Sequence, residues 1–68
     1  MPGWRTGLNG KQVLRLLKNN GWVIERISGS HYVLAKGKKV VSVPVHGQKD
    51  LKIGTLKNIE KISGVKLT

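Results

Sequence analysis

The chain has 68 residues and no cysteine, and its 13 lysines and arginines against three acidic residues give a formal net charge of +10. This length suffices for one small domain, and the composition excludes disulfides, thiolate catalysis and cysteine-based zinc sites. Three acids far apart in sequence also argue against a catalytic carboxylate pair or a magnesium site. The excess positive charge favours a nucleic-acid partner over charge that serves solubility alone, or over an anionic protein or membrane surface.

The first nine residues lack the hydrophobic core of a signal peptide. We expect residues 1–9 to form a loose extension and residues 10–68 to form a single domain. Apolar runs in the chain fall well short of the roughly 18 residues that span a membrane, so we expect no membrane association. Together with the lack of cysteine, this fits a cytoplasmic protein.

The first predicted element is a helix from Gly10 to Asn20. Asn9 and Gln12 have the spacing of a capping box, and apolar residues follow with helical periodicity until Gly21. Three cations recur at four- and three-residue spacing along one stripe of this helix: Lys11, Arg15 and Lys18. The stripe fits an ordinary solvated face and an RNA contact equally well.

Three β-rich segments follow, and we predict strands over residues 22–27, 31–36 and 39–45. Ser28-Gly29-Ser30 indicates the turn between the first two strands. Gly37-Lys38 suits a two-residue hairpin loop with glycine first, the type II′ arrangement. Short connections of this kind predict an antiparallel meander.

A second helix is predicted over Ile53–Ser63, with Leu56, Ile59 and Ile62 on its apolar stripe and Gly64 at its end. The element order is therefore α-β-β-β-α, an α+β fold. We expect a three-stranded antiparallel sheet with two helices on one face and the other face open to solvent.

His31 lies at the junction between the turn and the second strand, and it is one of two histidines. Histidine is the side chain that gains and loses a proton nearest to neutral pH, so it suits acid–base catalysis. If Tyr32 and Leu34 point toward the helices, His31 and Val33 point to the open face, accessible to a substrate. The opposite register would make His31 a core residue without a catalytic role.

Two groups of motifs carry a resemblance to a known family. The first group is Asn20-Gly21-Trp22-Val23, Arg26 and Gly29-Ser30-His31-Tyr32. The second group is Val43-Pro44-Val45-His46, Gly47, Lys49-Asp50-Leu51-Lys52 and Gly54-Thr55-Leu56. Over about Lys11 to Leu67 the chain resembles the HicA toxins.

The resemblance implies a double-stranded-RNA-binding-domain-like fold and an mRNA interferase, a small endoribonuclease that arrests translation. It also implies inhibition by a HicB antitoxin, and it places the family's catalytic histidine on His31. Two features depart from the family pattern. Tyr32 stands where many members carry a second histidine, and the chain has additional residues before its first helix.

RNA carries its own nucleophile, the 2′-hydroxyl, so cleavage needs proton transfer and charge stabilisation but no metal or other cofactor. We expect His31 to perform one or both proton transfers. His46 is either the second proton carrier or a turn residue. The residues expected to contact RNA phosphates are Gly29, Ser30, Lys49, Lys52 and Lys57, the lysines lying around the start of the second helix.

Two other functions fit the sequence. One is a non-catalytic RNA-binding module in which His31 is a surface contact, and the other is an interaction domain for an acidic protein. We expect the free protein to be monomeric.

Overall fold

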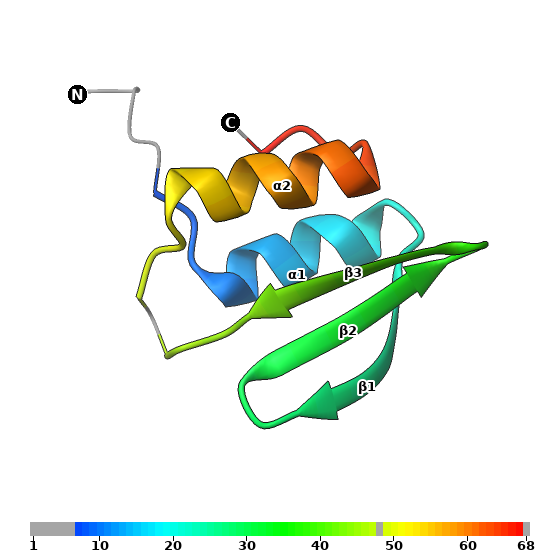
Figure 1. The fold of residues 1–68 in the computed structure, drawn as a ribbon, viewed down its shortest axis with the longest axis horizontal. Coiled ribbons are helices and arrows are strands. Elements are labelled where there is room, and N and C mark those ends of the chain that lie inside the picture. Colours follow the sequence, from blue (N-terminus) through cyan, green and yellow to red (C-terminus); the bar gives the residue numbers. More distant parts are fainter. Residues whose placement is uncertain (1–6, 48, 68) are drawn as a thin grey trace.

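The computed structural model describes residues 7–47 and 49–67. Figure 1 shows a helix, a three-stranded meander and a second helix. The elements are α1 (Gly10–Asn19), β1 (Val23–Ser28), β2 (His31–Lys36), β3 (Lys39–Pro44) and α2 (Ile53–Ser63). The strands are antiparallel in the order β1-β2-β3, which confirms the predicted α-β-β-β-α fold.

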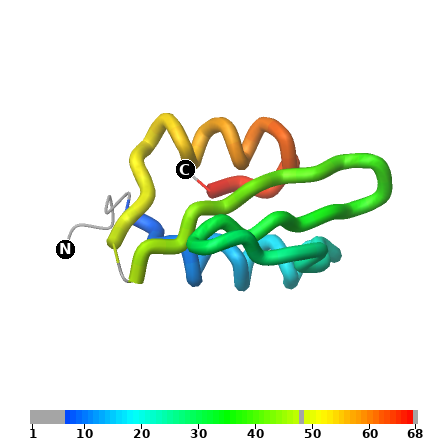
Figure 2. The backbone as a smooth tube through the Cα atoms, turned by 60° about the horizontal axis from the view of Figure 1, so that its bottom comes forward, coloured from blue at the N-terminus to red at the C-terminus, as the bar shows by residue number. Residues whose placement is uncertain are grey.

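Both helices lie on the same side of the sheet, and in the view of Figure 2 the strands run between α2 and α1. The core between these layers is formed mainly by six fully buried side chains: Val13, Leu17, Leu34, Val43, Leu56 and Ile59. The helices pack chiefly against β3, whereas β1 forms an edge of the sheet with most of its side chains exposed. No helix of the described residues covers the opposite face of the sheet, as the sequence predicted.

Local sequence explains where the helices begin and end. Asn9 and Gln12 form the predicted capping box, with two reciprocal hydrogen bonds of 2.9 Å each. Helix α1 ends at Asn19, one residue earlier than predicted, because Asn20 leaves the helical conformation and serves as its C-cap. Gly64 ends α2 as predicted, in the left-handed conformation with φ of 75°.

The first and third strands differ from the prediction by one residue at their ends, whereas the second strand matches it. Trp22 precedes β1 and is buried in the core, so the strand begins at Val23 and extends to Ser28. The third strand was predicted to reach Val45, but it ends at Pro44, which has no N–H to donate to a neighbouring strand. The Gly37-Lys38 loop agrees with type II′, because Gly37 has φ of 62° and Lys38 has no positive φ.

Leu8 and Asn9 contact the domain although we assigned them to a loose extension. The carbonyl oxygen of Leu8 accepts a hydrogen bond of 2.8 Å from the N–H of Leu51, and Asn9 forms a β-bridge with Asp50. The prediction for residues 1–6 lies outside the described residues. In the described ranges, 7–47 and 49–67, no helix has the length and apolar character needed to cross a bilayer.

Gly10 marks the point where α1 meets the end of β3. A Cβ atom at this position would lie 2.7 Å from the carbonyl oxygen of Pro44 and 2.8 Å from the Cα of Val45. We expect Gly10→Ala to lower the free energy of unfolding by about 1–3 kcal/mol, because backbone atoms must shift to make room. Chemical denaturation measures this loss.

The matched control is Gly54→Ala, in the first turn of α2. Apart from its two chain neighbours and the adjacent backbone of α2, no described atom lies within 4 Å of the added Cβ. This substitution should be neutral or stabilising by up to about 1 kcal/mol, since alanine is the better helix former. Equal stabilities of the two variants would contradict a close contact between α1 and β3.

Candidate active site and nucleic-acid interface

The register of the sheet places His31 on the open face. Tyr32 pairs with Val43 and Leu34 with Val41, and these residues face the helices. Because neighbouring residues of a strand point to opposite faces, His31 points away from the core, and its side chain is exposed. The first of the two registers considered from the sequence is therefore the one observed.

The turn before His31 is held against the end of β3. Gly29 has φ of 59°, and Ser28 pairs with His31 across this two-residue turn. The carbonyl oxygen of Ser30 accepts a hydrogen bond of 2.7 Å from the N–H of Val45. This bond fixes the turn, and with it the backbone that carries His31.

His46 follows β3 and lies close to His31. The centroids of the two imidazole rings are 6.5 Å apart, and the ring planes meet at 83° in an edge-to-face arrangement. A tight turn positions His46, since its carbonyl oxygen accepts a hydrogen bond of 3.1 Å from the N–H of Lys49. Both rings are solvent-exposed, so one surface ligand can reach both.

A depression of about 300 Å³ adjoins the histidine pair. It is lined by Pro44, His46, Lys49, Asp50, Leu51, Lys52 and Thr55. Pro44 pairs with His31 across the sheet, so it connects the depression to the second imidazole. Two ammonium groups, an imidazole and the carboxylate of Asp50 thus surround one concave surface, with positive charge in excess.

The N-terminus of α2 opens toward this depression. Its N-cap residue is Lys52, which makes no side-chain capping hydrogen bond in the described structure. The first-turn N–H groups, which have no partner within a helix, and the helix dipole both favour an anion here. At α1, by contrast, the side chain of Asn9 already accepts from the N–H of Gln12.

Two imidazoles and several cations share one surface, an arrangement that suits proton transfer next to a bound phosphate. A family model matches residues 10–65, nearly all of the domain, and it describes the HicA toxin of bacterial toxin-antitoxin systems. This chain belongs to the HicA toxin family. No individual curated protein matches the chain at a significant level.

Membership in the HicA family assigns the chain a toxin role and implies a partner antitoxin. The family match begins at Gly10, the first residue of α1, and ends at Val65, just after α2. It therefore includes all five elements and every residue of the candidate site.

The HicA structure brings together most of the residues that the sequence singled out. His31, His46, Lys49 and Lys52 gather at one end of the sheet, with the Gly29-Ser30 turn next to them. Lys57 is exposed on α2 but does not line the depression. The stripe on α1 lines a separate concavity.

Two polar lining residues of this HicA site, Asp50 and Thr55, were not proposed as site residues from the sequence. Both belong to motifs that carry the family resemblance, Lys49-Asp50-Leu51-Lys52 and Gly54-Thr55-Leu56, which is the signal that pointed to them. Among the described residues, no group of three or more histidines and acids is placed to hold a metal ion.

Proposed function

We propose that this HicA toxin is a metal-independent endoribonuclease that cleaves mRNA and so inhibits translation. The observation that carries this proposal is the His31–His46 pair, 6.5 Å between ring centroids, at the rim of a depression lined by Lys49 and Lys52. A hydrogen bond spans about 3 Å between heavy atoms, so both rings can contact the same phosphodiester group.

In the proposed reaction, one imidazole removes the proton of the 2′-hydroxyl as this oxygen attacks the adjacent phosphorus. A bond forms between the 2′-oxygen and phosphorus, and the bond from phosphorus to the 5′-oxygen breaks. The other imidazole, protonated, donates its proton to the departing 5′-oxygen. The products are a 2′,3′-cyclic phosphate and a 5′-hydroxyl, so protons and charges balance without a metal.

The remaining site residues stabilise charge. Lys49, Lys52 and the open first turn of α2 supply cations and N–H donors where the pentacoordinate phosphorus gathers negative charge. Gly29 leaves the turn next to His31 open. Apart from its two chain neighbours, no described atom lies within 4 Å of the point that a Cβ atom would occupy at this residue. In this proposal Gly29 and Ser30 let the RNA backbone approach closely, and Lys57 contacts a neighbouring phosphate.

Many family members carry a second histidine where this chain has Tyr32. In this proposal, His46 supplies the second imidazole instead. The Tyr32 side chain packs against the hydrophobic core on the helix side of the sheet, so it is not available beside His31. In the proposed mechanism, His46 takes the place of a histidine adjacent in sequence. A HicB-like antitoxin in the cytoplasm would inhibit this toxin.

The chemistry of cleavage tests the proposal. We expect the purified protein to cut an oligoribonucleotide in the presence of EDTA, leaving a 2′,3′-cyclic phosphate that mass spectrometry detects. The same oligonucleotide with 2′-O-methyl groups should remain uncut, because it has no free 2′-hydroxyl. Loss of cleavage in EDTA, or cleavage of the methylated strand, would contradict the mechanism, and binding without cleavage would indicate a non-catalytic RNA-binding module.

A further inference from the structure

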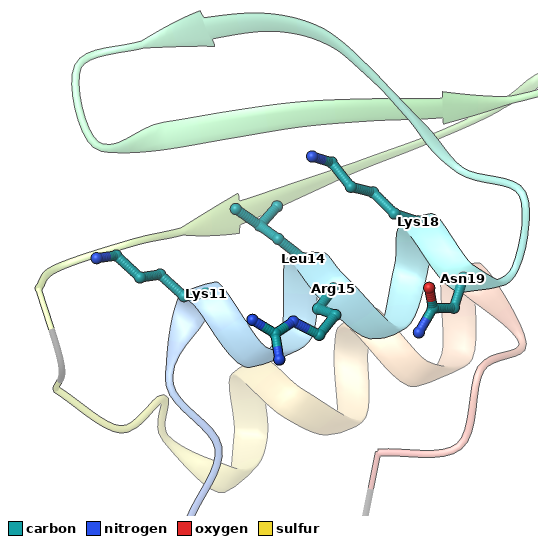
Figure 3. A pocket seen from close by; sticks show the side chains of 5 residues that line it. All are labelled: Lys11, Leu14, Arg15, Lys18 and Asn19. Atoms are coloured by element: carbon teal, nitrogen blue, oxygen red, sulfur yellow. The ribbon is translucent and has the colours of Figure 1, made fainter.

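A second concave surface lies along α1, outside the candidate active site. It has a volume of about 280 Å³ and is lined by Lys11, Leu14, Arg15, Lys18 and Asn19. Figure 3 shows Lys11 and Lys18 extending from the helix on either side of Leu14, with Arg15 beside them. None of the described residues that line this surface is acidic.

This arrangement of charge works against the stability of α1. Lys11 lies in the first turn, where the helix dipole disfavours a cation by about 0.3–1 kcal/mol. Lys11 and Arg15 are four residues apart, a spacing at which like charges repel by about 0.2–0.5 kcal/mol. Lys18 lies in the last turn, where the dipole favours a cation. The unfavourable positions of Lys11 and Arg15, on a surface lined by no acidic residue among those described, indicate a ligand that supplies the negative charge.

The stripe begins at the end of the sheet that carries His31. Gly10, the neighbour of Lys11, is packed against Pro44 and Val45, and Pro44 pairs with His31. From Lys11 to Lys18 the helix rises about 10 Å, at roughly 1.5 Å per residue. Phosphates of a DNA strand repeat about every 3.4 Å along the helix axis, so a comparable RNA strand would present several phosphates to a stripe of this length.

We propose that Lys11, Arg15 and Lys18 form a phosphate track that binds the RNA backbone beyond the cleaved bond. This inference rests on the proposed function, and it assigns the RNA to α1 as well as to the start of α2. The track contacts phosphates through charge, with no base edge to read, so it adds affinity for RNA without sequence preference. Leu14 forms the apolar floor between the two lysines.

The salt dependence of RNA binding tests the track. All measurements use the His31→Ala background, so that the RNA remains intact, and a labelled oligoribonucleotide of mixed sequence as the probe. The variant is Lys11→Gln, Arg15→Gln and Lys18→Gln combined. The control combines Lys38→Gln, Lys39→Gln and Lys66→Gln. It removes the same charge from exposed positions that line neither the active-site depression nor the surface along α1.

Losing three phosphate contacts should reduce the slope of log K against log salt by about 2, at roughly 0.7 per contact for a single strand. We expect affinity at low salt to fall about 10- to 100-fold in the α1 variant and much less in the control. Thermal unfolding should show that the α1 variant is about as stable as its parent, because the repulsion removed at Lys11 and Arg15 offsets the favourable position lost at Lys18. Equal slopes in both triple variants would overturn the track, as would an unchanged slope in the α1 variant.

The outcome separates the track from the proposed function. Wild-type protein that does not cleave RNA, together with the reduced slope, would refute the nuclease and support the track. Wild-type cleavage with equal slopes would support the nuclease and overturn the track. A stripe that serves solely an acidic partner protein would also leave RNA binding at the control level, which counts against the track.

Discussion

Replacing His31 with alanine is expected to lower the rate of RNA cleavage by about 10²–10⁴-fold, the usual contribution of one general acid or base. The fold should be unaffected, because the side chain is exposed on the open face and contributes nothing to the core. Single-turnover cleavage of an oligoribonucleotide measures the loss. Circular dichroism and RNA affinity, both expected to remain close to wild type, are the controls.

His46→Ala separates two forms of the mechanism. If the two imidazoles act on the same phosphodiester, His46→Ala should also cost about 10²–10⁴-fold, and the double variant should be little worse than either single one. Groups that act as a unit are not additive in their effects. Cleavage at the wild-type rate by His46→Ala would show that His31 performs both proton transfers, and full activity of His31→Ala would contradict the site itself.

The second large effect is expected on stability, from Leu34→Ala. Leu34 is fully buried at the centre of β2 and packs between the sheet and the helices. Truncating such a leucine costs about 2–5 kcal/mol, through lost burial and the cavity that remains. A domain of this size has roughly 3–10 kcal/mol in total, so a large share of the protein should unfold at moderate temperature.

Ile27→Ala is the matched control for Leu34→Ala. Ile27 lies on the neighbouring edge strand, and 55% of its surface is exposed, so its truncation should cost well under 2 kcal/mol. Urea denaturation compares the midpoints of both variants with that of wild type. A similar loss of stability in both variants would mean that the helices bury the side chains of β1 as well as those of β2, which disagrees with the described packing.

Local sequence was enough to predict the order of the elements and the two alternative faces on which His31 could lie. The capping box, the turn glycines and the helical periodicity act within a few residues, so the pattern itself indicates them. The choice between the two sheet faces required one further observation, that Tyr32 and Leu34 contact the core.

Features that depend on pairing between distant segments could not be predicted. The bulge in β1 between Ile24 and Arg26 lets Ile24 and Ile27 share a face, although they are three positions apart in the sequence. The bulge is defined by the pairing of β1 with β2, so the sequence of β1 alone does not reveal it. The proximity of His31 and His46 likewise depends on the register of β2 with β3 and on the turn after β3.

The hydrogen bond between Leu8 and Leu51 has a consequence for the order in which the protein is made. The loop that carries Lys49 and Lys52 is tied to a segment that is synthesised before α1, whereas α2 is synthesised after all three strands. Because α2 supplies Leu56 and Ile59 to the core, the nascent chain has no complete hydrophobic core until α2 has been made. A growing chain that stops short of α2 therefore lacks the assembled site.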